Sequence, residues 1–264
     1  MINALVVGGT GGLGGAIASE LARRGCSVGL IAREEARISR MVESLGARSW
    51  GFAADVLDPL GLSKAITAAE ARFGGIDAVI FAAGRFRAIG PIELVAPEEW
   101  RLDLETSLLG ASNAIRAALP ALRRSNAASI SVLVGPGHHK GDRHASASTS
   151  AQAGLVRLVE CLDLELRAVP IPIYAVFPGL TPVGRTVHLV ESTAGRTFLP
   201  EYTEALGEGK EVGPEVAAEM VAWLASRRPK ELSGRVVFAL STPELLEARL
   251  EAVAREDRGR LRVV

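Results

Sequence analysis

Short apolar runs alternate along the chain with longer segments of helical periodicity. The apolar runs, at residues 2–7, 27–31, 49–53, 78–81, 129–134, 173–177 and 235–240, predict buried strands. Apolar residues at helical spacing between them, as at Leu13, Ile17 and Leu21, predict helices at 12–24, 34–45, 59–73, 98–124, 145–167 and 216–226. This alternation is typical of right-handed βαβ units. We therefore expect an α/β fold, with a doubly wound parallel sheet of about seven strands and helices on both faces.

The pattern does not divide the chain, so we expect residues 1–264 to form a single domain. Residues 181–213 form the one long stretch without a regular pattern, and we call them the lid segment because such stretches often cap a ligand cleft. Residues 243–264 form a C-terminal tail, in which Leu245, Leu246, Leu250 and Val253 suggest a final amphipathic helix.

Composition excludes several partner classes. Lys plus Arg and Asp plus Glu number 30 each, which gives no reason to expect nucleic acid or a membrane surface as partner. No apolar run approaches the length of a membrane span and no basic leader opens the chain, so we expect a cytoplasmic protein. Cys26 and Cys161 are expected to be small buried residues in a reducing compartment.

A glycine-rich turn joins the first strand to the first helix. It reads Gly8-Gly9-Thr10-Gly11-Gly12-Leu13-Gly14-Gly15. Glycines permit a tight turn and a close approach of the backbone to a pyrophosphate, while the helix start presents free N–H groups and the positive end of its dipole. The order strand, glycines, helix therefore predicts a dinucleotide site that includes Gly8, Thr10, Gly11, Gly12, Leu13 and Gly14.

The end of the second strand indicates which dinucleotide binds. Many NAD-binding units carry an acid there for the ribose, whereas this chain has Ala32 followed by Arg33. A guanidinium matches a 2′-phosphate, which favours NADP(H) over NAD(H). An alternative stays open, in which Arg33 is only a solvated charge at the start of a helix. The neighbouring acid Glu34 is the reason to keep it.

Four further motifs occur in order: Asp55-Val56, Phe81-Ala82-Ala83-Gly84, Pro178-Gly179 followed by Thr181, and Leu232-Ser233-Gly234-Arg235. With the glycine turn, they make the chain resemble the short-chain dehydrogenases/reductases, which are single-domain Rossmann-type oxidoreductases. The resemblance implies that the cofactor contacts Asp55, Val56, Ala82, Ala83, Gly84, Pro178, Gly179 and Thr181. It also implies a homodimer or homotetramer through the two long helices.

The family's catalytic residues are missing from the matching positions. The family uses a Ser, a Tyr, a Lys and an Asn, and this chain carries Gly135, Ser148, Gln152 and Ser107 in their places. A Ser hydroxyl is a far weaker acid than a phenol, and no cation remains to tune it. Gln152 can still hydrogen-bond a ribose hydroxyl of the cofactor.

A polar loop offers replacement groups after the fifth strand. We expect His138, His139 or His144 to donate a proton, with Ser148 nearby, while Lys140 or Arg143 would stabilise an oxyanion. His188 in the lid segment is a further candidate, and a merely solvated loop is an equal alternative. No metal site is expected, because His138, His139, Asp142 and His144 match no ligand spacing. Tyr174 is expected in the core, whereas Tyr202 could reach a ligand.

Three functions remain open. The first is an atypical NADP(H)-dependent oxidoreductase acting on a small carbonyl or hydroxyl compound without the Tyr–Lys pair. The second is an inactive family member that serves as a cofactor-binding partner subunit of an active homologue, or as an NADPH sensor. The third is a non-redox lyase or cyclase in the same cleft.

Overall fold

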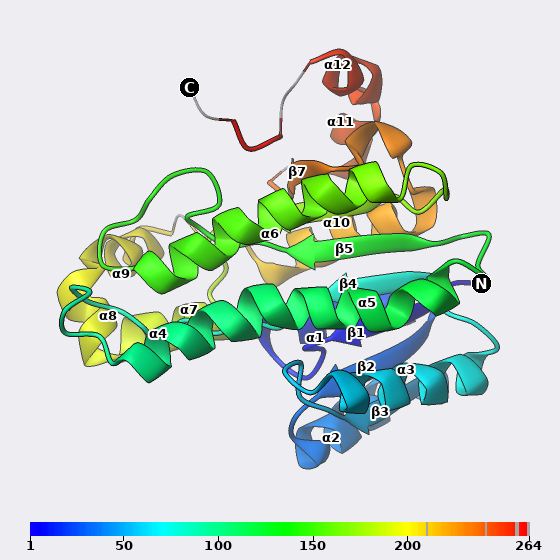
Figure 1. Cartoon of the computed structure of the whole chain (residues 1–264), viewed down its shortest axis with the longest axis horizontal. Helices are drawn as coiled ribbons and strands as arrows, with labels where there is room; N and C mark the ends of the chain where they lie inside the picture. Colours follow the sequence, from blue (N-terminus) through cyan, green and yellow to red (C-terminus); the bar gives the residue numbers. More distant parts are fainter. Residues whose placement is uncertain (210, 241, 257–258, 263–264) are drawn as a thin grey trace.

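One parallel sheet of seven strands organises the molecule, in the order β3-β2-β1-β4-β5-β6-β7 (Figure 1). This computed structural model describes residues 1–209, 211–240, 242–256 and 259–262. The order reverses between β1 and β4, and ligands bind in open α/β sheets at such a switch point. The strands are β1 (Asn3–Val7), β2 (Ser27–Ala32), β3 (Ser49–Ala53), β4 (Ala78–Phe81), β5 (Ser129–Leu133), β6 (Ile173–Phe177) and β7 (Arg235–Phe238).

Helices cover both faces of the sheet (Figure 1). One face carries α1 (Gly12–Arg23), α2 (Glu35–Leu45) and α10 (Pro214–Arg227), and the other carries α3 (Pro59–Phe73), α5 (Gly110–Leu122) and α6 (Ser146–Glu165). The predicted long helix is built from α4 (Pro97–Leu104), a π-helical turn (Glu105–Leu109) and α5. Within the described part of the chain, no helix has the length and apolarity to cross a bilayer. The predicted fold class is confirmed.

The strands are apolar because both faces of the sheet are covered. In β1, Leu5 and Val7 pack into the core on the α3, α5 and α6 side, whereas Ala4 and Val6 pack into the core on the opposite side. Alternate residues of a strand point to opposite faces, so a strand buried on both sides is apolar at most positions; the small Ser129 and Ser131 of β5 are exceptions.

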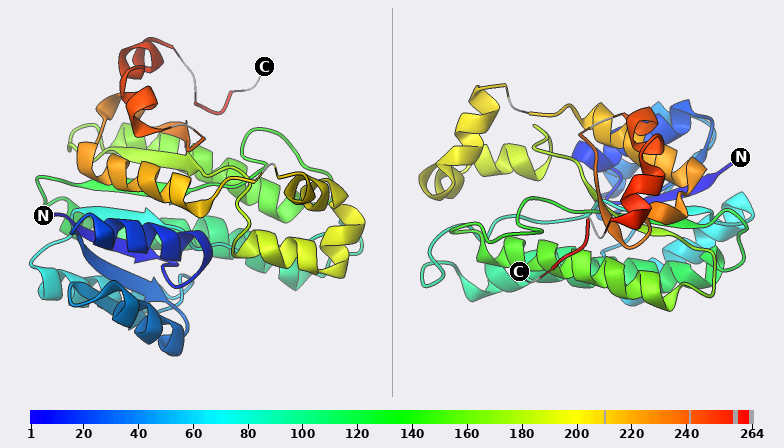
Figure 2. Two further views of the ribbon diagram at one scale, coloured as in Figure 1. Left: turned by 180° about the vertical axis from the view of Figure 1, so that it is seen from behind. Right: turned by 90° about the horizontal axis from the view of Figure 1, so that it is seen from above.

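The lid segment differs from the irregular stretch expected. It contains three short helices, α7 (Arg185–Glu191), α8 (Thr193–Phe198) and α9 (Pro200–Gly207), which lie beyond the carboxyl ends of the strands (Figure 2). The expectation was wrong because helices of this length are too short to show a periodic pattern. Leu189 and Leu199 pack with Phe86 and Ile89, which attaches the lid segment to the loop after β4.

Two further expectations are corrected. The C-terminal tail forms α11 (Pro243–Glu247) and α12 (Leu250–Arg255) rather than one amphipathic helix; its residues 257–258 and 263–264 lie outside the described part. A short 3₁₀ turn, Lys230–Leu232, precedes β7. Cys26 is buried as expected, but Cys161 lies on the exposed face of α6.

A buried carboxylate fixes the loop that follows β4. Asp103 on α4 is fully buried, and its Oδ2 accepts hydrogen bonds from the backbone N–H groups of Arg87 (2.7 Å) and Ala88 (2.8 Å). Its Oδ1 pairs with the Arg85 guanidinium at 2.9 Å, and Arg85 also pairs with Glu99. The loop is thereby held in one position against α4.

The glycine turn depends on direct backbone packing. A Cβ on Gly14 would lie 2.1 Å from the Gly8 carbonyl oxygen, so Gly14→Ala forces the turn apart. We expect the free energy of unfolding to fall by about 1–3 kcal/mol, as overpacking typically costs. Urea denaturation measures this loss. The control is Gly11→Ala: its Cβ would meet nothing within 4 Å and its backbone is extended. Equal losses in the two variants would contradict the packing argument.

The Asp103 network predicts unequal costs for its two acids. Asp103→Ala leaves two buried N–H groups and one guanidinium without their acceptor, so we expect a loss of about 3–5 kcal/mol, as for a broken buried pair. Glu99→Ala removes a half-exposed partner of the same Arg85 and should cost less than about 1 kcal/mol. Chemical denaturation of both variants gives the comparison, and similar losses would contradict it.

Candidate functional site

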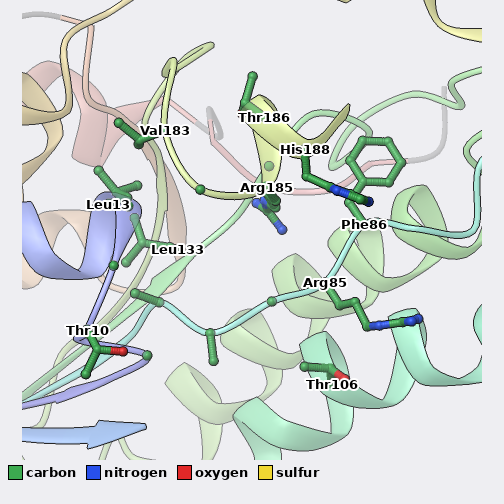
Figure 3. Close-up of a pocket in the computed structure, with 18 of the residues that line it drawn as sticks. Thr10, Leu13, Arg85, Phe86, Thr106, Leu133, Val183, Arg185, Thr186 and His188 are labelled. Carbon is green, nitrogen blue, oxygen red and sulfur yellow. The ribbon is translucent and has the colours of Figure 1, made fainter. Parts of the chain in front are cut away.

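A cavity of about 720 Å³ lies at the carboxyl ends of β1, β2, β4 and β5, beside the switch point. Its walls come from the glycine turn, from the loops after β2, β3 and β4, and from the lid segment. Figure 3 shows part of this lining, with Thr10 and Leu13 on one side and Arg185 and His188 on the other. The location agrees with the sequence expectation for a ligand site.

Most of the predicted cofactor residues line this cavity. The lining includes Gly8, Thr10, Gly11, Gly12, Leu13, Arg33, Asp55, Val56, Ala82, Ala83, Gly84, Pro178, Gly179 and Thr181. Two predicted residues are not in the lining. Gly14 packs against the Gly8 carbonyl, and Gln152 is buried behind Gly135. The structure thus brings together segments that are far apart in the sequence, and the role of each residue in cofactor binding stays a prediction.

The start of α1 presents backbone donors at this cavity. The first N–H that bonds back along the chain is that of Gly15, to the Gly11 carbonyl at 3.2 Å, and no side chain caps the helix. The N–H groups of Gly12, Leu13 and Gly14 therefore precede the intrahelical pattern, and an anion would satisfy them. On the opposite side, a Cβ on Gly12 would lie 3.0 Å from the Cα of Gly184, so the lid segment borders the turn directly.

Two arginines line the cavity at the end of β2 and the start of α2. Arg33 is exposed, and no other described residue hydrogen-bonds or ion-pairs with its side chain. Arg37, which the sequence analysis missed, lies beside it and pairs with Glu34 at 2.9 Å. Arg33 precedes α2 and Arg37 lies in its first turn, so the signal available from sequence was a second arginine close after the end of β2.

Two of the four positions that the sequence assigns to the family's catalytic residues contain polar atoms without partners. The Oε1 atom of Gln152 accepts a hydrogen bond from the Gly135 N–H at 2.6 Å, but its Nε2 is buried without a partner. The Oγ atom of Ser107, in the π-helical turn, is likewise buried and unpartnered. Such turns often occur at functional sites. Ser148 is 5% exposed and does not belong to the described cavity lining.

Arg185 occupies the space in front of these positions. Its side chain is directed from the start of α7 into the cavity, whereas Arg85 turns away toward α4 (Figure 3). A Cβ on Gly135 would lie 2.6 Å from Nη2 of Arg185, and a Cβ on Gly84 would lie 3.0 Å from Nη1. The guanidinium therefore lies between the ends of β4 and β5, and the sequence analysis did not identify it.

The histidine-rich loop lies elsewhere, so its predicted catalytic role gains no support from the geometry. Of the described residues that line the cavity, none is His138, His139, His144 or Ser148. The His138 ring is buried against Phe177, its Nδ1 is 3.0 Å from the Gly135 carbonyl oxygen, and burial lowers its pKa. Burial thus disfavours the charged form of His138, which is poorly placed to donate a proton to a ligand.

The other loop residues are also turned away from the cavity. His139 is exposed to solvent, and His144 packs on Phe198 with ring centroids 5.2 Å apart. No group of three potential metal ligands is found among the described residues. His188, the further candidate, does line the cavity.

The two tyrosines behave differently. Tyr174 is fully buried in β6 and its hydroxyl donates to the Pro229 carbonyl at 3.3 Å, which confirms a core role. Tyr202 lines the cavity, and its hydroxyl donates to Asp142 Oδ2 at 3.0 Å. Burial, together with the Asp142 carboxylate, raises the pKa of Tyr202, so its phenol holds its proton firmly.

Comparisons with known proteins agree with this architecture. The model of the short chain dehydrogenase family matches residues 3–193. A putative ketoacyl reductase of the granaticin polyketide synthase from Streptomyces violaceoruber is 30% identical over 84% of this chain and 86% of its own length. The 3-oxoacyl-[acyl-carrier-protein] reductase of Escherichia coli is 28% identical over 89% of this chain and 93% of its own.

Solved structures of similar proteins share this architecture. A variant of the actinorhodin polyketide ketoreductase, solved with NADPH, superposes with a TM-score of 0.79 at 27% identity, covering 90% of this chain and 95% of its own. The KRED1-Pglu enzyme superposes with a TM-score of 0.83 at 26% identity, covering 90% of this chain and all of its own. With the glycine turn, the switch-point cavity and the family match over most of its length, the chain belongs to the short chain dehydrogenase family.

Proposed function

We propose that this protein is an NADP(H)-dependent oxidoreductase that acts on a small carbonyl or hydroxyl compound without the family's Tyr–Lys pair. The observation that carries the proposal is the cavity, whose walls hold the glycine turn, two arginines after β2 and the lid segment. Relatives named as ketoacyl reductases, and a similar structure solved with NADPH, support the same class of activity.

The residues fit a nicotinamide dinucleotide. The unpaired N–H groups at the start of α1 suit its pyrophosphate, and Arg33 with Arg37 suits a 2′-phosphate. Gln152 Nε2, which is buried without a partner, suits a hydroxyl of the nicotinamide ribose. When bound, the nicotinamide supplies or accepts the hydride, so the protein's task is to position the substrate and move one proton.

His188 is the residue best placed to move that proton. Imidazole is the side chain that ordinarily exchanges protons near neutral pH, and His188 lines the cavity (Figure 3). Tyr202 lines it too, but its hydroxyl already donates to Asp142 and its raised pKa makes it a poor acid. The geometry thus favours His188 over the loop histidines.

One observation favours a second function. On the sequence-based assignment, none of the four catalytic positions carries the family's side chain, and Ser148, assigned to the place of the Tyr, lies outside the described cavity lining. A cofactor-binding subunit without turnover, paired with an active homologue, would have no use for those side chains. NADPH binding without turnover of any carbonyl substrate would support it.

The arginines predict the cofactor preference. NADPH should bind more tightly than NADH, and Arg33→Met should weaken NADPH binding by about 10- to 100-fold, since charge-assisted hydrogen bonds contribute roughly 1.5–3 kcal/mol. NADH affinity should stay unchanged. Calorimetric titration measures both, with Arg40→Met as control, because Arg40 is exposed on the adjoining α2 and lies outside the described cavity lining. Tighter binding of NADH by the unaltered protein would contradict the assignment.

The position of His188 predicts where the proton comes from. His188→Gln should lower kcat for NADPH oxidation by about 10²- to 10⁴-fold, as the loss of a general acid does, while the Kd for NADPH stays the same. Steady-state kinetics over a carbonyl panel gives this result. A comparable loss in His139→Gln, with none in His188→Gln, would support the loop histidines instead.

A further inference from the structure

The guanidinium of Arg185 reaches the part of the cavity next to the carboxyl ends of the neighbouring strands β4 and β5. Its Nη1 and Nη2 lie close to Gly84 and Gly135, at 3.0 Å and 2.6 Å from the positions that a Cβ would take. Two residues without side chains therefore leave the space that the guanidinium fills. The lid segment delivers this cation to the position where the family places its catalytic Ser.

No acidic side chain neutralises Arg185. Among the residues that the structure describes, none forms an ion pair or a side-chain hydrogen bond with its guanidinium. Two acids on neighbouring elements have other partners. Asp103 is held by Arg85 and two backbone N–H groups, and Asp142 accepts from Tyr202. Arg185 is partly buried, and this burial lowers its pKa against the opposing effects of Tyr202 and Asp103.

The unpartnered groups around Arg185 are mostly donors. The Oγ–H of Ser107 is free to donate, and Gln152 Nε2 has two N–H donors, one of which remains when the other holds the nicotinamide ribose. The side chain of Gln152 lies beside Gly135, 3.7 Å from the same Cβ position, and Ser107 Oγ lies 3.6 Å from that of Gly84. A partly buried cation flanked by unused donors is suited to an anion, and a planar guanidinium matches a carboxylate through two parallel hydrogen bonds.

We propose that Arg185 is the subsite for a carboxylate on the substrate, so that this protein acts on a small oxo acid or the corresponding hydroxy acid. The inference rests on the proposed oxidoreductase function and narrows its substrate class. It distinguishes this chain from relatives named for reduction of acyl groups carried on a protein, whose acid group is not free. Because the same cavity also has to hold the dinucleotide, the remaining space suits a small acid.

The test is a binding measurement, because binding does not depend on turnover. Pyruvate and acetoacetate, each beside its methyl ester, are titrated calorimetrically into the protein saturated with NADP⁺, which cannot reduce them. We expect the acids to bind at least about tenfold more tightly than the esters, as expected for a charge-assisted bidentate contact. Arg185→Met should remove the difference, and Arg185→Lys should keep part of it, since an ammonium retains the charge without the fork.

The matched control is Arg87→Met. Arg87 is an exposed cation in the lining of the same cavity, so its removal tests whether any positive charge there suffices. The acid preference should persist in this variant. Equal affinity for acid and ester, no binding of either acid, or a preference that survives Arg185→Met would each overturn the inference.

The outcome separates this inference from the proposed function. If NADP⁺ binds and acid and ester behave alike, the oxidoreductase proposal stands and the carboxylate subsite falls. If neither NADP⁺ nor NADPH binds, the oxidoreductase proposal fails, and the same titrations on the free protein still decide whether Arg185 takes a carboxylate.

Discussion

The packing of backbone directly on backbone between β1, α1 and β4 is the constraint on which the site depends. Gly8 lies so close to Ala83 that a Cβ would be 2.6 Å from the Ala83 nitrogen, and its φ of +88° also favours glycine. Gly14 likewise packs directly against the backbone of Gly8. Only this close approach brings the uncapped start of α1 beside the end of β4, where strand order reverses. The backbone donors, the cavity and the border with the lid segment follow from it.

The distribution of charge within the cavity matters more than the balanced total. Arg33 and Arg37 lie in the part of the lining that follows β2. Arg185 comes from the lid segment and lies beside the loops that follow β4 and β5. The carboxylates near them already have partners within the protein: Glu34 pairs with Arg37, and Asp55 accepts a hydrogen bond from the Leu57 N–H. Excess positive charge at both places is suited to a ligand with phosphate at one end and an anionic group at the other.

The sequence predicted the strands well because buried parallel strands are short, apolar and separated by helices of clear periodicity. β3, β4 and β6 agree with the predicted runs to the residue. The lid segment was misjudged because its helices are short and are stabilised by contacts with the loop after β4, which local pattern does not encode. His138 looked chemically available in the sequence, but its ring is buried against Phe177, and only the fold shows that.

Arg185 shows why the positions that the sequence assigns to the family's catalytic residues could be listed from sequence but not interpreted. In the sequence, Gly135 only lacks a hydroxyl, and an arginine fifty residues later has no connection to it. In the fold the two are one arrangement, because any Cβ at 135 would meet the guanidinium at 2.6 Å. A serine there would require the guanidinium to shift, which the end of a flexible side chain can do, so in the present arrangement Gly135 and Arg185 share one space.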